Sequence, residues 1–364
     1  MPVVRSVAIV PPATGPGGMF MNVLARRMQR LATAAAVAAC LVTTARAEPL
    51  ATCGGWESYA VFDVLFMQRD NTANDGPLVL DGDNLATAIG TPDLQFPTAP
   101  GIRTVYGQHG PEGIGWEVGY LGVYGMFADA AAVGNANLEI APPLSSEVAG
   151  LRGASAARAT YGSVLNSAEV NVLLTERCVH RPRLSGYAAE CQRCAFTVDW
   201  LAGFRWAGLD EQAALAFGDD PAALATGYAV RTSSNLFGGQ LGVRGRADWQ
   251  AWAVEGWAKA ALAGSVLAQS QDPIIDSVTG DIYRSARGSR TDTPGGIFDV
   301  GATLVYRLSD TWGLRFGYSM LWLTGVALAP DQFDFAADTR AGTRLDGNQT
   351  LWLGGANLGL EKRW

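Results

Sequence analysis

Residues 196–206 read FTVDWLAGFRW, and this stretch decides the fold. Large apolar side chains, among them Trp200 and Phe204, occupy one parity of the run. The other parity carries Asp199 and Arg205. Because successive side chains of a strand point to opposite faces, the segment is predicted to be a β-strand with one apolar face and one polar face.

The same alternation recurs along the chain. Residues 298–306 and 312–322 both show it, and the three residues 309–311 between them are predicted to form a tight hairpin turn. Further runs of this kind are found at 56–69, 114–127, 166–175, 227–246 and 252–262. Runs of about ten to fourteen residues exceed the usual strand of a soluble sheet and suffice for a tilted strand to cross a bilayer. The sequence therefore predicts an all-β protein, an antiparallel transmembrane β-barrel.

Aromatic residues tend to stand at the ends of these runs, as Trp206, Trp252, Trp312 and Trp322 do. Tryptophan and tyrosine gather at both membrane–water interfaces of outer-membrane barrels. A large secreted β-sandwich also alternates and is the alternative. The glycines on the polar faces and the aromatic ends favour the barrel.

The lengths of the connections predict the topology. Short connections are expected at 208–211, 246–250 and 309–311, and long ones near 70–112, 178–194, 267–295 and 326–348. Outer-membrane barrels have short periplasmic turns and long outer loops, so all four long connections are predicted to lie outside. The count is about ten strands, with 212–218 the weakest, or twelve if residues 128–160 contain a further pair; an even number is expected.

The N-terminus predicts export. Arg26, Arg27 and Arg30 precede an uncharged stretch, and residues 45–47 read Ala-Arg-Ala, a signal peptidase pattern. We expect a signal peptide over 1–47 and the barrel over 48–364. Residues 37–40 also resemble a lipoprotein box ending in Cys40, which is the alternative for this segment.

Charge and composition exclude several function classes. Residues 1–47 hold five arginines and no acidic residue, so residues 48–364 carry 22 basic against 34 acidic side chains, a balance of −12. Such a chain lacks the basic footprint of a nucleic-acid-binding protein, and no nucleic-acid partner is expected. The chain has only two histidines, His109 and His180, which is few for histidine-based catalysis or a histidine-rich metal centre. Neither an enzyme nor a cofactor or metal is therefore expected.

Charged residues on the polar parity are candidates for the barrel interior. Opposite signs in a narrow lumen more often pair as a structural network than set ion selectivity, and a barrel of about ten strands is expected to be mostly filled. The candidates are Glu169, Asp199, Arg205, Arg244, Glu255, Lys259, Asp299, Arg307 and Arg315.

Three cysteines lie close together in the predicted loop at 178–194. We expect Cys178 to form a disulfide with Cys191 or Cys194, because exported proteins meet oxidising surroundings. Together with His180 the three could instead form a zinc site by residue type and spacing. Cys53 is expected near the periplasmic end of the first strand, so its pairing with this loop would contradict the predicted topology.

The last strand carries a candidate assembly signal. Leu358, Leu360 and the terminal Trp364 share one parity, as the barrel assembly machinery of the outer membrane requires of a final strand. Lys362 departs from this pattern, although a lysine at a sheet edge also guards against aggregation.

Three segments carry a family resemblance. They are WLAGFRW at 200–206, NLFGGQLG at 235–242 and GANLGLE at 355–361. Their order resembles the planctomycete-type outer-membrane β-barrel family of unknown function, over roughly residues 55–364. The resemblance implies location in the cell outer membrane, with the lipid bilayer and the assembly machinery as partners. It implies no catalytic or ligand residues.

These features predict an integral outer-membrane barrel with a structural or surface-interaction role. Its long loops would meet a surface partner whose identity the sequence does not give. The alternative is a narrow channel or small-solute transporter.

Overall fold

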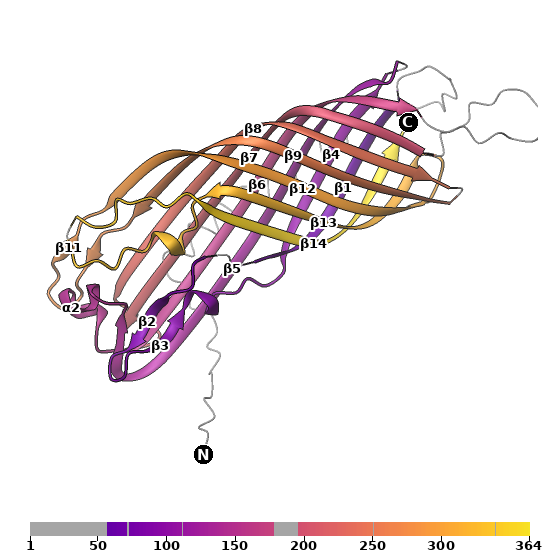
Figure 1. Ribbon diagram of the computed structural model, residues 1–364. Helices are drawn as coiled ribbons and strands as arrows, with labels where there is room; N and C mark the ends of the chain where they lie inside the picture. The colour runs from indigo at the N-terminus through magenta and orange to yellow at the C-terminus, as the bar shows by residue number, and fades with distance from the viewer. Residues whose placement is uncertain (1–56, 71–72, 111, 178–195, 250, 339) are drawn as a thin grey trace, which may run out of the picture. The chain divides into compact units, whose positions relative to one another are not determined.

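Ten antiparallel strands form a closed barrel in the computed structural model (Figure 1), which describes residues 57–364 apart from 71–72, 111, 178–195, 250 and 339. Each strand pairs with its neighbour along the barrel, and β1 pairs with β14 to close it. The predicted all-β barrel is confirmed. Its strands are β1 (Glu57–Arg69), β4 (Ala99–His109), β5 (Ile114–Ile140), β6 (Ala154–Arg177), β7 (Phe196–Gly218), β8 (Thr226–Asp248), β9 (Trp252–Gln271), β12 (Arg287–Arg307), β13 (Trp312–Val326) and β14 (Gln349–Arg363).

The alternation of the sequence becomes the two faces of the wall. In β7, Leu201 and Arg205 are buried in the interior, whereas about half of the Trp200 and Phe204 surface is exposed on the outside. The outer face is therefore apolar, as a lipid-facing surface requires. Within the described residues, no helix is long and apolar enough to span a membrane.

Two aromatic levels bound the membrane-facing band. Trp252 and Trp312 stand at the end of the barrel with the short turns, while Trp206 and Trp322 stand farther along their strands. Ten residues separate Trp312 from Trp322. At about 3.3 Å per residue and a tilt of about 40° they span roughly 25 Å, the height of the apolar band of outer-membrane barrels.

The expected turn at 208–211 is wrong, because β7 runs through it without interruption. Two adjacent acidic residues suggested a turn, yet they are successive positions of one strand. Asp210 faces outward and is exposed, whereas Glu211 faces the interior and is buried. Likewise, residues 128–160 contain no further strand pair, since they extend β5 and β6.

The misread turn also changes the side expected for one predicted long loop. An extra strand crossing reverses the side of every connection that precedes it, but β4 was expected to be part of a loop, and this missed crossing restores the side of 70–98. The last residue of β6 and the first of β7, which flank the loop predicted at 178–194, lie at the end that holds the short turns 110–113, 249–251 and 308–311. The predicted loop itself lies outside the described residues. Cys178, Cys191, Cys194 and Cys53 themselves lie outside the described residues, as does the predicted signal peptide.

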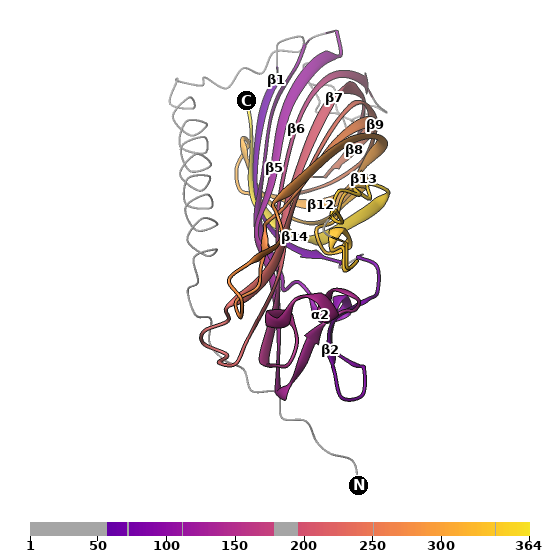
Figure 2. The same cartoon turned by 90° about the vertical axis from the view of Figure 1, so that its left-hand side faces the viewer.

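The other three predicted loops lie at the opposite end but are shorter than expected. The connection after β1 covers 70–98 and contains the hairpin β2 (Pro77–Asp81) and β3 (Ala86–Gly90), while 99–109 is barrel strand β4. The connections 272–286 and 327–348 contain β10 (Ile274–Ile275), β11 (Ile282–Arg284) and the 3-10 turn η4 (Pro330–Gln332). Figure 2 shows β2 and the short helix α2 (Leu144–Glu147) at the end of the barrel remote from the C-terminus.

The wall is uneven in height. β5 to β9 and β12 have 20 to 27 residues, whereas β1, β4, β13 and β14 have 11 to 15. Crossing a bilayer takes about 9 to 11 residues. The six long strands therefore continue past a membrane of that thickness at the end opposite the short turns, where about ten more residues add roughly 30 Å along the strand. We call the connections at this end the outer connections, since this is the end that the sequence predicts to lie outside.

Asp276 ties two outer connections together and generates a pH prediction. Partial burial alone would raise the pKa of its carboxyl, but the N–H groups of Val278, Ala149 and Gly150 donate hydrogen bonds to it and hold the pKa below its ordinary value of 3.8. This stabilisation is complete above the ordinary pKa and is lost as the pH falls through the lowered one.

We expect the Ala149 and Gly150 amides to keep their hydrogen-exchange protection from pH 7 down to about 4 and to lose it below. Asp276→Asn should lower that protection already at pH 7. Hydrogen exchange measured by mass spectrometry, with correction for the intrinsic exchange rate, checks this. Equal protection in the variant and the wild type at pH 7 would contradict it.

Candidate functional site: the barrel interior

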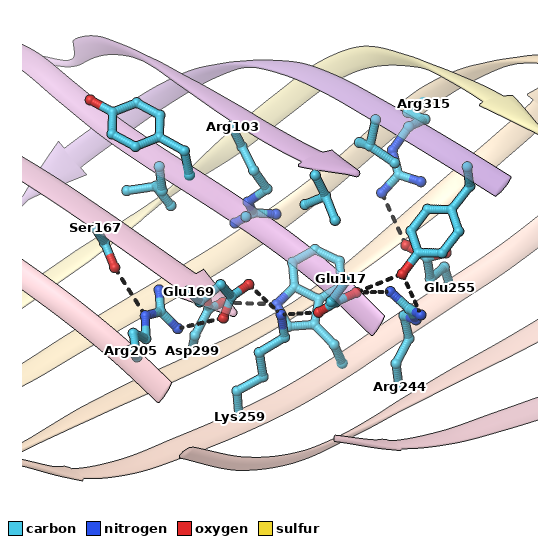
Figure 3. Close-up of a pocket in the computed structure, with 17 residues that line it drawn as sticks. Arg103, Glu117, Ser167, Glu169, Arg205, Arg244, Glu255, Lys259, Asp299 and Arg315 are labelled. Carbon is cyan, nitrogen blue, oxygen red and sulfur yellow. Dashed lines mark hydrogen bonds and ion pairs between the residues drawn. The ribbon is translucent and has the colours of Figure 1, made fainter. Parts of the chain in front are cut away.

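The half of the interior near the short turns is filled by a network of charged side chains, which we call the ionic layer (Figure 3). Its members point inward from strands on all sides of the barrel and are almost entirely buried. They are Asp63, Arg103, Glu117, Glu169, Asp199, Arg205, Arg244, Arg246, Glu255, Lys259, Asp299, Arg315 and Glu361.

Lys259 bridges the lumen. Its Nζ lies 3.1 Å from Glu117 Oε1 and 2.6 Å from Glu169 Oε1, so β9 is joined to β5 and β6, with which it is not paired. Arg244 adds a second bridge, from β8 to Glu117 at 2.7 Å and to Asp199 at 2.7 Å. The lumen is therefore crossed by ion pairs rather than lined by them.

Two further groups complete the ionic layer. Arg205 lies 3.0 Å from Asp299, which also accepts a hydrogen bond from the Trp257 indole at 2.8 Å. Arg315 reaches Glu361 at 2.8 Å and Glu255 at 3.1 Å. Because each of these buried carboxylates has a partner of opposite sign, its desolvation is offset locally.

The structure brings together all of the predicted interior residues except Arg307. Arg307 lies at the short-turn rim, where it pairs with Asp248 and donates to the Trp249 carbonyl at 3.0 Å. Sequence reasoning missed Asp63, Glu117 and other members of the ionic layer. For Asp63 and Glu117 the signal was present, since each is a lone charge between two apolar neighbours in an alternating run.

The other half of the interior is packed with apolar side chains, and we call it the apolar plug. Wall residues such as Leu215 and Phe217 meet residues of the outer connections, such as Phe96 and Leu328, and all are almost fully buried. The plug is thus built from segments 70–98 and 327–348, which turn back into the barrel.

A buried ion pair fastens both segments. Arg69 lies 2.6 Å from Glu211, and its guanidinium carbon lies 4.6 and 4.9 Å from the ring centroids of Phe96 and Tyr161, which also pack against each other. Glu211 also accepts a hydrogen bond from the backbone N–H of Ala329 at 3.0 Å. One carboxylate therefore holds β1, β7 and the connection 327–348 together.

Side-chain hydrogen bonds to the backbone hold the rest of 327–348. Gln271 donates to the Gln332 carbonyl at 3.1 Å, and Gln269 donates to the Arg344 carbonyl at 2.8 Å. The buried Arg284 donates to the carbonyl of Asp334 at 2.9 Å. This segment is an integral part of the packed interior rather than a loose flap.

The interior offers little to acid–base or metal chemistry. Carboxylates of the ionic layer are already engaged by cations, which leaves them poor general bases. The Nδ1 atom of His109 lies 3.0 Å from Thr175 Oγ1, and Thr175 in turn donates to Asp199 at 2.8 Å. Among the described residues, no group of three or more His, Cys, Asp or Glu side chains could hold a metal ion.

The chain matches a known protein family over most of its length. A family model described as "Putative beta barrel porin-7 (BBP7)" matches residues 67–364. The chain belongs to this family. The match begins within β1 and ends at the last residue, so it takes in nearly the whole barrel. This BBP7 protein is a β-barrel of the outer membrane, and its apolar outer face fits a lipid surround.

Several solved structures are similar to the BBP7 barrel at low identity. The outer membrane protease OmpT of Escherichia coli is 10% identical with a TM-score of 0.45, over 86% of this chain and 98% of that one. A major outer membrane protein of Thermus thermophilus is 12% identical with a TM-score of 0.31, over 85% and 99%. The toluene transporter TodX of Pseudomonas putida is 10% identical with a TM-score of 0.30, over 85% and 89%. No curated protein matches the chain.

The two lysines of the BBP7 barrel body make a matched pair for testing the ionic layer. Lys259→Met leaves the buried carboxylates Glu117 and Glu169 short of a cation, which costs about 3–5 kcal/mol of unfolding free energy. Lys362 lies at the rim over the rings of Trp312 and Trp364, and Lys362→Met should cost less than about 1 kcal/mol.

Urea unfolding of the refolded barrel in detergent micelles, followed by tryptophan fluorescence, compares the two variants. Equal losses of unfolding free energy for both would mean that the Lys259 bridge contributes no more than a surface contact.

Proposed function

We propose that this BBP7 protein is a closed, non-enzymatic barrel that acts through its outer surface. One observation carries the proposal: segment 327–348 is bonded into the interior above an ionic layer that is itself crossed by ion pairs. To pass through the barrel, a solute would have to displace both segment 327–348 and the ion pairs of the ionic layer. A structural or surface-interaction role follows more directly from such a molecule than passive diffusion does.

The distribution of charge supports a surface role. The outer connections 70–98, 141–153, 219–225, 272–286 and 327–348 hold fifteen acidic and four basic residues, a balance of −11. This is nearly the entire net charge of residues 48–364. An acidic outer surface favours partners with exposed positive charges, through both attraction and faster encounter.

A narrow channel is the second candidate. The description of the family as porin-like favours it, and the ionic layer is a polar route if the apolar plug can leave. When a voltage is applied across the membrane, a channel would carry an ionic current, whereas a closed barrel would not.

Planar-bilayer recording of the purified protein is the deciding experiment. We expect no reproducible ohmic steps, because the apolar plug and segment 327–348 pack together inside the barrel and would obstruct the flow of ions. Protein from the same preparation should migrate faster on an SDS gel before boiling than after, which shows that a closed barrel was present. Regular conductance steps from such a preparation would sink the closed-barrel proposal in favour of the channel.

Glu211→Gln and Asp210→Asn test the plug with adjacent residues of one strand. The first leaves Arg69 as a buried cation without its carboxylate, at a cost of about 3–5 kcal/mol. We expect faster hydrogen exchange through 327–348 and brief conductance events in this variant. Asp210 faces outward, so its variant should behave as the wild type does.

We also propose that the assembly machinery reads the last strand. Leu358 and Leu360 face outward in β14 and are about two-fifths exposed, as is Trp364. Trp364→Ala should lower the outer-membrane yield severalfold in quantitative blots of membrane fractions. Trp249→Ala, which removes an exposed tryptophan from a short turn, is the control and should leave the yield unchanged.

A further inference from the structure

Asp331 lies at the contact between the two connections that help to fill the outer half of the barrel. It belongs to η4 in segment 327–348, and its Oδ1 accepts a hydrogen bond from the backbone N–H of Asn74, in segment 70–98, at 2.8 Å. The other carboxyl oxygen, Oδ2, is buried and has no hydrogen-bond partner among the described residues. The contact between the two connections therefore contains a carboxyl group with only one of its oxygens hydrogen-bonded.

The surroundings of this carboxyl oppose its ionisation. Burial raises the pKa of Asp331 above its ordinary value of 3.8, and the negative charges of Asp346 and Glu211 raise it further. The hydrogen bonds from Asn74 lower the pKa only in part. Glu211 has its own cation, because Arg69 lies 2.6 Å from it, so Asp346 is the uncompensated neighbour.

No cation among the described residues forms an ion pair with Asp331. Further charged residues flank the chain positions that meet at this contact, but they are exposed to solvent. They are Asp70 and Asp75 on either side of Asn74, and Arg340 and Arg344 before Asp346. A buried carboxylate without a cation is costly, and the loss of its charge is the simplest way to remove that cost.

We propose that Asp331 is a proton-operated latch: the loss of its charge in mildly acidic surroundings tightens the packing of segments 70–98 and 327–348 inside the barrel. Because the pKa of Asp331 is raised in the packed state, the charged form opposes packing above that pKa. This opposition disappears as the pH falls through the raised pKa. The outer half of the barrel is therefore closed more firmly in mild acid than at neutral pH.

Other carboxylates of the region would respond to acid in the opposite direction. Glu211 accepts the backbone N–H of Ala329 at 3.0 Å, and Asp334 accepts that of Gly342 at 2.7 Å. Protonation of either carboxylate would weaken its hydrogen bond and loosen the segment. Tightening in mild acid is therefore a response that Asp331 would give and these carboxylates would not.

Hydrogen exchange of the protein in detergent micelles, measured by mass spectrometry, tests the latch. After correction for the intrinsic rate, opening of 327–348 should become rarer between about pH 7 and pH 5, by up to about tenfold for each unit by which the pKa is raised. The peptide that contains Asn74 should respond in the same way. The Ala149 and Gly150 amides, which Asp276 holds, should keep constant protection over this range and provide the internal control.

Asp331→Asn and Asp338→Asn form a matched pair of variants within the same segment. The first keeps the shape of the side chain and removes its charge. We expect its segment 327–348 to be protected at pH 7 as well as that of the wild type is at pH 5, with no gain on acidification. Asp338 is exposed and accepts the N–H of Arg340 at 2.8 Å, so its variant should keep the wild-type response.

Wild-type protection of 327–348 that stays constant or falls between pH 7 and pH 5 overturns the latch. An equal gain in Asp331→Asn and the wild type does so as well. If Asp331→Asn fails to refold, the wild-type titration still decides, because the amides held by Asp276 reveal general effects of pH. The latch does not rest on the proposed function: conductance plays no part in the readout, so failure of the closed-barrel proposal and failure of the latch remain distinguishable.

Discussion

Closure of the sheet on itself is the constraint on which the rest of the structure depends. Once β14 pairs with β1, every second side chain of ten strands is committed to an interior that has little room for water. Charged side chains on that face must then find partners of opposite sign across the lumen. The ionic layer is the result, and its longest bridges, such as Lys259 to Glu117, join strands that never pair.

The ionic layer and the apolar plug fill the two halves of the interior with different chemistry. Near the short turns the inward residues are charged and pair with one another. Toward the outer end they are apolar, and the barrel brings in its own connections to cover them. Glu211 and Arg69 form a separate ion pair within the apolar plug, where hydrogen bonds with Tyr161 and Ala329 and the rings beside the guanidinium replace the charged neighbours of the ionic layer.

Alternation made the barrel and most interior charges predictable from sequence, since parity is a local property. The expected count of about ten strands agrees with the structure because the false break in β7 and the missed strand β4 offset each other. Partners were not predictable. That Lys259 meets Glu169 depends on which strands face each other across the lumen, and the sequence of one strand holds no such information. The error at Asp210 and Glu211 has the same origin, because two neighbouring acids read locally as a turn until an interior partner, Arg69, is known.

The uneven height of the wall determines which part of this BBP7 protein a macromolecule could contact. Six strands rise past the lipid and four do not, so the outer connections are carried on a one-sided sheet rather than on a ring. Of this sheet, residues 287–295 of β12 pair with β9 alone among the described strands, and the free edge holds Pro294 and charged residues, which discourage further strand pairing. If this end faces outward, as the proposed surface role requires, a bulky macromolecule that cannot enter the headgroup layer would meet the acidic outer connections from the side of the six long strands only.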